Sequence, residues 1–295
     1  SNTIFGKSAG ASLDAGSNQN TFIGENVSDA SMNDALGNTV VGYSAGSAIT
    51  TSDYNTILGR NAGLLLSTGA SNVMVGNGAG ATTVDVDNSV LIGLHAGGGA
   101  TITAAADGTV AIGSSALTAL TSGAKNTAVG YYASSGFTTG ASNTALGYGA
   151  LSGTGGATVL DSDHNTAVGA DSMNGTWTTT KAEGNTAVGS STMQGAMQGA
   201  ENNTAIGYQS AQAITTGGSN TALGKGAGGT VSTGDSNTLV GSGAGYNIGT
   251  NSNNTCMGQN AGASLTSSDN TIIGSYAGDV LAGGTANVVV GRAAL

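Results

Sequence analysis

Proline is entirely missing from this chain of 295 residues. Because proline cannot donate a backbone hydrogen bond, it is excluded from strands that are paired along both edges. Its absence suits a chain in which most strands have two neighbours. Charged side chains are also scarce, at 7% of the residues where about 25% is usual in a globular domain.

Basic residues are the rarest charged class, with six Lys and Arg against 16 Asp and Glu, for a net charge of −10. A chain of this charge lacks the positive surface that attracts nucleic acid or an anionic membrane. No apolar run approaches the roughly 20 residues of a membrane-spanning helix. We therefore expect no nucleic-acid partner and no membrane insertion.

Cysteine occurs once, at Cys256, so no internal disulfide can form. This residue falls within a repeated apolar pattern, which favours a small buried hydrophobic side chain over a reactive thiol. The chain begins without Met and ends four residues after the last repeat. We expect it to be a segment of a longer protein.

What the chain does contain is a repeated pentad. Asn-Thr-Ala-Val-Gly occurs at 126–130, 165–169 and 185–189, and 17 variants of it close on glycines from Gly6 to Gly291, with a mean period of about 17.8 residues. Helical repeats need roughly 33 to 47 residues, whereas one coil of a β-solenoid needs about 20 or fewer. The sequence predicts an all-β chain, residues 1–295 forming a single parallel β-solenoid (β-roll or β-helix) of about 17 coils with a repeat of about 17 to 18 residues.

Positions in each coil are counted here from the pentad Asn as the first. The second position is β-branched in every copy, Thr in thirteen and Val in four, which is typical of a strand. The fourth position is always large and apolar, so we expect it to line the inner core together with a small eighth residue and an apolar residue seven or eight places after the glycine.

The third position should then point to the opposite, outer face. It is apolar in every copy, with an unbroken run of Ala from Ala111 to Ala222 and larger residues on either side. An exposed apolar stripe of this length is unusual in a soluble monomer, so the chain should self-associate through it. The candidates for this contact between chains are Phe22, Ile57, Ala111, Ala145, Ala167, Ala205 and Ile272.

Two polar rows accompany the strands. The first position is Asn in fifteen of the 17 copies, and a structural role, at a left-handed corner or in a ladder of stacked amides, is favoured over a ligand-binding row of amides. A flat lattice of Thr would suggest ice binding, but only one Thr per coil is expected on the face of the core aliphatic residue. Ice binding is kept as an alternative.

No catalytic or metal-binding constellation stands out. Acidic residues are scattered, neither His lies near a Ser or Cys in a repeating geometry, and we expect no enzyme and no cofactor. The densest acidic spots lack the ligand number and the glycine-aspartate repeat of calcium-binding β-rolls, so solvated corner residues are favoured and no metal is assigned. These spots are Asp85 with Asp87, and Asp161 and Asp163 with His164.

Three intervals between pentads are longer than the rest, at 20, 22 and 20 residues. Extra residues in a solenoid leave as loops on one side, which is often the binding side. The candidate receptor contacts lie in the last two of these intervals, between Gly147 and Gly189, and are Trp177, Tyr148 and His164. The alternative is tolerated variation in loop length, with the only tryptophan filling an ordinary inward position.

The rhythm of Asn-Thr-Ala-Val-Gly, Ala-Gly and Thr-Thr-Gly-Ser-Asn-Thr resembles the shafts of bacteriophage tail fibres. It is also similar to the heads of trimeric autotransporter adhesins, with their Ser-Val-Ala-Ile-Gly-like pentads. The resemblance covers the whole chain and implies a homotrimer of parallel β-rolls, extracellular or on a virion. We expect a structural segment of such a fibre; the alternatives are a bacterial surface adhesin for a host glycan or protein receptor, and an ice-binding solenoid.

Overall fold

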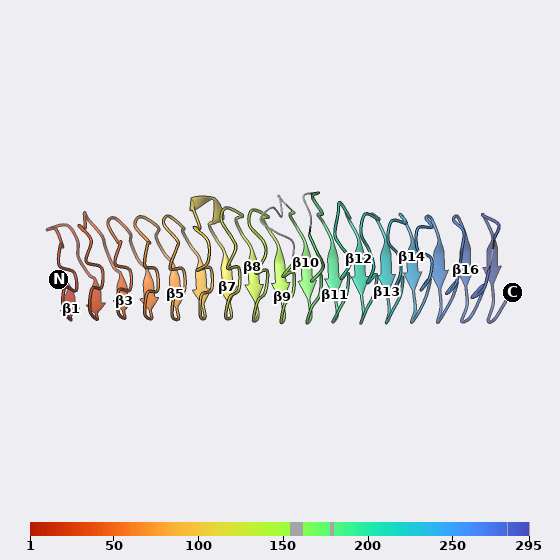
Figure 1. The fold of residues 1–295 in the computed structure, drawn as a ribbon, viewed down its shortest axis with the longest axis horizontal. Coiled ribbons are helices and arrows are strands. Elements are labelled where there is room, and N and C mark those ends of the chain that lie inside the picture. The colour runs from red at the N-terminus through yellow and green to blue at the C-terminus, as the bar shows by residue number, and fades with distance from the viewer. Residues whose placement is uncertain (154–161, 178–179, 282, 295) are drawn as a thin grey trace. The chain divides into compact units, whose positions relative to one another are not determined.

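The fold was analysed in a computed structural model that describes residues 1–153, 162–177, 180–281 and 283–294. The chain divides into two compact units, Ser1–Asn143 and Thr144–Leu295. Each unit is a series of coils, and each coil contributes one short strand (Figure 1). No described helix is long and apolar enough to cross a membrane.

Every strand consists of the second, third and fourth positions of one pentad. In the first unit the strands are β1 (Thr3–Phe5), β2 (Thr21–Ile23), β3 (Thr39–Val41), β4 (Thr56–Leu58), β5 (Val73–Val75), β6 (Val90–Ile92), β7 (Val110–Ile112) and β8 (Thr127–Val129). In the second unit they are β9 (Thr144–Leu146), β10 (Thr166–Val168), β11 (Thr186–Val188), β12 (Thr204–Ile206), β13 (Thr221–Leu223), β14 (Thr238–Val240), β15 (Thr255–Met257), β16 (Thr271–Ile273) and β17 (Val288–Val290). One 3-10 turn, η1 (Ala104–Ala106), lies in the 20-residue interval between β6 and β7.

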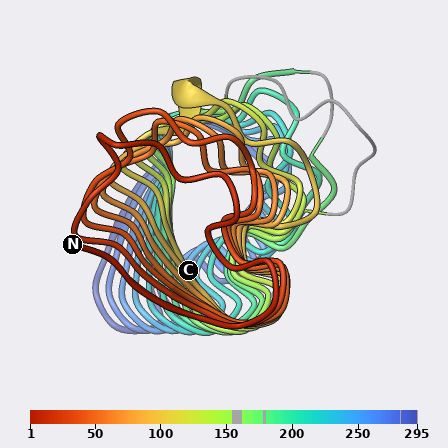
Figure 2. The ribbon, with the colours of Figure 1, turned by 90° about the vertical axis from the view of Figure 1, so that its left-hand side faces the viewer.

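Within each unit, every strand pairs in parallel with the next strand along the chain. The register places like positions side by side, for example Thr204 beside Thr221 and Ala205 beside Ala222. Successive coils of a unit therefore superpose when viewed from the end (Figure 2). The predicted parallel β-solenoid is confirmed.

The glycine that closes each pentad has a conformation open to no other residue. Its φ angle lies between +123° at Gly169 and +143° at Gly130. A Cβ atom on Gly207 would lie 2.6 Å from the carbonyl oxygen of Gly224 in the next coil. Both the backbone angle and the stacked carbonyl exclude a side chain, which explains why this position never varies.

The inward and outward faces of the strands are the reverse of the prediction. The third position is buried in every strand from β2 to β17, as with Ile57 and Ala205, whereas the fourth position is buried in none. The prediction rested on size, because the fourth position is always large. Alternation along a strand separates two faces but does not say which one is inside.

The rest of the core agrees with the prediction. The eighth position is a buried small residue, as at Ala45 and Ala227, and the later apolar residues Ile49, Phe137 and Leu265 are at most 1% exposed. Leu13 is less completely buried than these. Cys256 is a third-position residue with no exposed surface, and its burial raises the pKa of the thiol to about 12.

Variation in the third position is compensated by the ninth position, four residues after the pentad glycine. Among the described residues, where the third residue is large the ninth is a left-handed glycine, except that Phe22 has the small Ser28 (φ +45°) in that place. A Cβ on Gly63 would lie 3.0 Å from the Cδ1 atom of Ile57. Where the third residue is Ala, the ninth carries a buried side chain in the same conformation, as at Leu117 (φ +52°), Leu151 (φ +54°) and Met193 (φ +50°).

One coil shows that this compensation also acts between neighbouring coils. Ala222 of β13 is small, yet the ninth residue of its coil is Gly228. A Cβ on Gly228 would lie 2.7 Å from the Cδ1 atom of Leu239, the third residue of the next strand. A ninth residue can therefore be large only where the third positions of its own coil and of the next coil are both small.

We predict that Leu239→Ala and Gly228→Leu rescue one another. Leu239→Ala alone should lower the free energy of unfolding by about 2 to 5 kcal/mol through the cavity it leaves. Gly228→Leu alone should lower it by about 1 to 3 kcal/mol through overpacking. Urea unfolding of the double variant should show a loss at least about 1 kcal/mol smaller than the sum of the two. Strictly additive losses would show that these positions do not share one space.

Candidate interaction surface

The second and fourth positions of the strands together form the outer strand face of each unit. The large fourth residues are conspicuously exposed, with Leu58 at 49%, Leu146 at 48% and Leu223 at 44% of their surface accessible. The Thr residues beside them are exposed or half-buried. None of the strands that make this face contains a charged residue.

The size of the outer strand face follows from the strand geometry. Strands repeat at about 4.8 Å across a sheet and three residues span about 10 Å, so eight strands give about 380 Å² and nine give about 430 Å². A face of this size in each unit lies within the range of about 300 to 600 Å² that the largest apolar patch of a soluble monomer covers, and such patches are often functional. Each face by itself is about half of the roughly 800 Å² that one partner contributes to a typical stable complex.

The sixth position, directly after the pentad glycine, borders this face and is Tyr, Lys or Arg in eight of the 17 coils. Its aromatic members are Tyr43, Tyr131, Tyr148 and Tyr208, each between 47% and 57% exposed. Four of the six basic residues stand at the same position, and they are Lys7, Arg60, Lys225 and Arg292. Arg60 lies over the ring of Tyr43, with 5.8 Å between its Cζ atom and the ring centroid. Tyr and Arg are the residues most enriched at protein interfaces.

The residues predicted to form the contact between chains do not lie on this surface. Phe22, Ile57, Ala111, Ala145, Ala167, Ala205 and Ile272 have no measurable exposure, because the third position points into the coil. The prediction that they meet a second chain is wrong. The fourth-position residues were the better candidates, and their signal in the sequence was that none of the 17 copies is small or polar there.

The three candidate receptor contacts are placed differently. Trp177 is 1% exposed and donates a hydrogen bond from Nε1 to the carbonyl oxygen of Met173 at 3.1 Å. It fills an inward position, as the alternative interpretation held, and cannot touch a receptor directly. Tyr148 is 57% exposed and His164 is exposed. These two remain on the surface of the second unit.

The acidic corner residues accept hydrogen bonds from the backbone of a neighbouring coil. Asp87 accepts from the amide of Ala70 at 2.6 Å, and Asp235 from the amide of Gly218 at 2.7 Å. Asp163 is paired with Lys181, whose Nζ atom lies 3.8 Å away, while Asp161 lies outside the described residues. Among the described residues no group of three or more His, Cys, Asp or Glu side chains is arranged to hold a metal ion.

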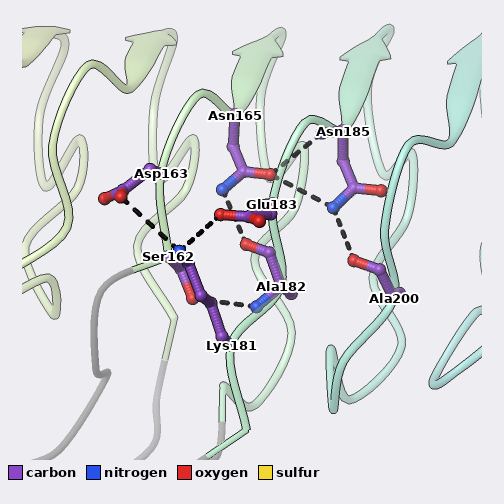
Figure 3. Close-up of polar contacts among 8 residues, drawn as sticks. All are labelled: Ser162, Asp163, Asn165, Lys181, Ala182, Glu183, Asn185 and Ala200. Atoms are coloured by element: carbon purple, nitrogen blue, oxygen red, sulfur yellow. Dashed lines mark hydrogen bonds and ion pairs between the residues drawn. The ribbon is translucent and has the colours of Figure 1, made fainter.

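The pentad Asn side chains form a ladder inside the coils. In Figure 3, the Nδ2 atom of Asn185 donates to Oδ1 of Asn165 at 3.1 Å and to the carbonyl oxygen of Ala200 at 2.8 Å. The backbone amide of Asn185 donates to the same Oδ1 atom at 3.1 Å. This ladder confirms the structural interpretation of the Asn row, and a ligand-binding row is wrong because the amides are buried. The left-handed conformation belongs to the residue before each Asn, such as His164 (φ +58°).

Lys181 connects two of these coils outside the ladder. Its Nζ atom lies 2.6 Å from Oε2 of Glu183 as well as 3.8 Å from Oδ2 of Asp163 (Figure 3). Its side chain is 44% exposed, so water screens these pairs and their contribution to stability is small. The ladder, which is buried, supplies the larger share of the polar stabilisation at this corner.

We predict that Asn220→Ala lowers the free energy of unfolding by about 2 to 4 kcal/mol, because it leaves several buried polar groups without a hydrogen-bond partner. Asn220 donates to Oδ1 of Asn203 at 3.0 Å and to the carbonyl oxygen of Gly234 at 2.8 Å, and it accepts from the amide of Asn237 at 3.0 Å. The matched control is Asn247→Ala, at an exposed position in the same unit, with an expected change within about 0.5 kcal/mol. Equal losses for the two variants in urea unfolding would contradict the ladder.

Comparisons of the chain with protein-family models, with curated proteins and with solved structures found no match.

Proposed function

We propose that this chain is a structural, non-catalytic segment of an extracellular or virion fibre, in which copies associate as a homotrimer through the outer strand face. The observation that carries the proposal is the fourth position, which is large and apolar in all 17 pentads and buried in none of the strands. A side chain that packs inside a coil would explain its size, but these side chains point outward. A second chain that covers them supplies the missing reason.

The energetics favour such association. Burying one large aliphatic side chain contributes about 1.5 to 3 kcal/mol when it is fully exposed beforehand, and the half-exposed residues of this face contribute part of that. Two chains lose about 4 to 15 kcal/mol of translational and rotational freedom when they bind. Several coils acting together offset this cost, and the absence of charge on the face means that no like charges are brought directly opposite one another when two chains of net charge −10 meet.

The extracellular setting rests on the resemblance of the pentad rhythm to phage tail-fibre shafts and trimeric autotransporter heads. A shaft needs a fold that can be lengthened by adding coils, and each coil here contacts only its neighbours. An adhesive role is compatible with the same scaffold, since the exposed tyrosines of the sixth position, among them Tyr148, are suited to stack on a sugar ring or a protein side chain. A host glycan or protein receptor is the partner that this role would add.

We predict that the native particle has three times the chain mass of 28.0 kDa. The double variant Ile206→Glu, Leu223→Glu should weaken the association at least a hundredfold, about 2.7 kcal/mol, because it buries charges without partners. Native mass spectrometry should then find single chains whose circular dichroism matches the parent, since the buried residues Ala205 and Ala222 are unchanged. Asn247→Glu, exposed but outside the face, is the control and should remain trimeric. A monomeric parent would sink the proposal.

Ice binding is the second candidate. The Thr row points outward in the structure, which favours ice binding more than the inward position expected from the sequence. Thr and an aliphatic residue now share one exposed face at the regular spacing of a parallel sheet. The fourth position, however, varies among Phe5, Leu58, Val75 and Met257, and so this face lacks the even height that a flat crystal plane requires.

The two candidates make opposite predictions, because a face buried between chains is not available to ice. Thermal hysteresis measured on a monomeric parent, and its loss in Thr204→Tyr, would establish ice binding. We expect no hysteresis from the parent at any concentration at which native mass spectrometry finds the trimer. A trimer that shows strong hysteresis would place the contact between chains on another face.

A further inference from the structure

Three consecutive strands of the first unit differ from the others in their outer strand face. The second position, Thr in β1–β4 and in β8, is Val73, Val90 and Val110 in β5, β6 and β7. The register pairs Val73 with Val90 and Val90 with Val110. The row of hydroxyl groups is therefore interrupted over three adjacent coils and over no other strand of this unit.

The fourth positions of the same strands complete a continuous apolar surface. Val75, Ile92 and Ile112 pair with one another in the same register, and all six side chains are partly exposed. We name this set the valine patch, and it consists of Val73, Val90, Val110, Val75, Ile92 and Ile112. It offers no hydrogen-bonding group, whereas every other coil of the first unit offers one hydroxyl.

Repeating surfaces have a difficulty when they associate with copies of themselves. Since nearly every coil presents a Thr beside a large apolar residue, two chains displaced by one coil, about 4.8 Å, would make contacts of the same kind, although the apolar residues differ in size. Flat repeated strands specify their register weakly for this reason. Only coils that differ from their neighbours can distinguish the correct alignment.

We propose that the valine patch sets the register of the fibre, by facing the valine patch of a parallel second copy. This inference rests on the proposed function, because it takes the outer strand face as the contact between chains. In the aligned arrangement Val meets Val, and Thr meets Thr, whose hydroxyls can bond to one another. A shift by one coil sets Val73 against Thr56 and Val110 against Thr127, and each displaced Thr loses its hydroxyl partner.

The size of the patch argues for a second copy over an unrelated partner. Three strands cover only about 140 Å² at ordinary sheet spacing, far below the roughly 800 Å² that each side of a stable complex contributes. The patch continues without a boundary into the rest of the outer strand face, through the pairs Thr56 with Val73 and Val110 with Thr127. It therefore acts as part of that larger surface.

The register can be measured by cross-linking in the full chain. Thr39 and Thr56 are exposed neighbours in adjacent coils, so a cysteine at each reports a displacement of one coil. Chains carrying Thr39→Cys and chains carrying Thr56→Cys, both with the buried Cys256 replaced by Ala, are refolded together and treated with a short bis-maleimide. In the parent background, links between identical positions should exceed links between different positions at least tenfold.

The decisive variant is Val73→Thr, Val90→Thr, Val110→Thr. It leaves the buried third residues Met74, Leu91 and Ala111 unchanged and places Thr where other coils of the chain already have it. We expect native mass spectrometry to find the trimer, while the tenfold preference falls to about twofold or less. The conservative control with Ile at the same three positions should retain the full preference.

Three results would overturn the inference. A triple Thr variant that keeps the tenfold preference would show that register is set elsewhere. A trimeric parent without that preference would show that its chains are not aligned in parallel. In both cases the proposed function survives, whereas a parent that is monomeric in native mass spectrometry removes the proposed function and this inference together.

Discussion

The structure depends on the stacking of each coil on the next at a fixed spacing, held by the buried Asn ladder and the pentad glycines. The side chain of Asn203 donates to Oδ1 of Asn185 in the coil before it and to the carbonyl oxygen of Gly217 near the end of its own coil. Its Oδ1 atom accepts from the backbone amide of Asn220 in the coil after it. The closing glycines bring carbonyl groups to where a side chain would otherwise lie. Because these contacts recur in coil after coil, the strands of successive coils stay in register and their inward residues share one packed interior within each unit.

This shared interior explains which sequence changes the core accepts. A large third residue leaves room at the ninth position only for glycine or, beside Phe22, for the small Ser28; an Ala frees the space for Leu151 or Met193. The same limit explains Gly228, which stands beside a small residue of its own coil but beneath Leu239 of the next. Size differences that look like drift along the sequence are therefore coupled substitutions within one packed volume.

Much of this architecture could be predicted from the sequence, because period, strand position and corner chemistry are local properties. The Asn ladder was predicted as well, whereas Trp177 was a candidate receptor contact and its inward place only the alternative. The direction of the strand faces was not correctly predicted, because Phe22 and Ile23 are both large and alternation alone treats them alike. The size of the ninth residue indicates which strand face is inside, but only the stacked structure shows that Gly228 makes room for Leu239 of the next coil and not for Ala222 of its own. The candidate contact residues were assigned to the wrong face for this one reason.

The Asn ladder is interrupted once within the first unit, where Ser89 and Thr109 replace Asn. The backbone amide of Ser89 still donates to Oδ1 of Asn72, and the backbone amide of Thr109 donates to Oγ of Ser89 at 3.0 Å. The coils of Ser89 and Thr109 are therefore joined at this corner by a hydroxyl group in place of a side-chain amide. In a stack where each coil touches only its neighbours, a pull along the axis passes through all of them in series. We expect the coils around Ser89 to separate first when the stack is pulled along its axis. Force spectroscopy would contradict this if those coils outlasted the uninterrupted ones. The interruption would fix the place at which a stack of these coils first lengthens when it is pulled along its axis.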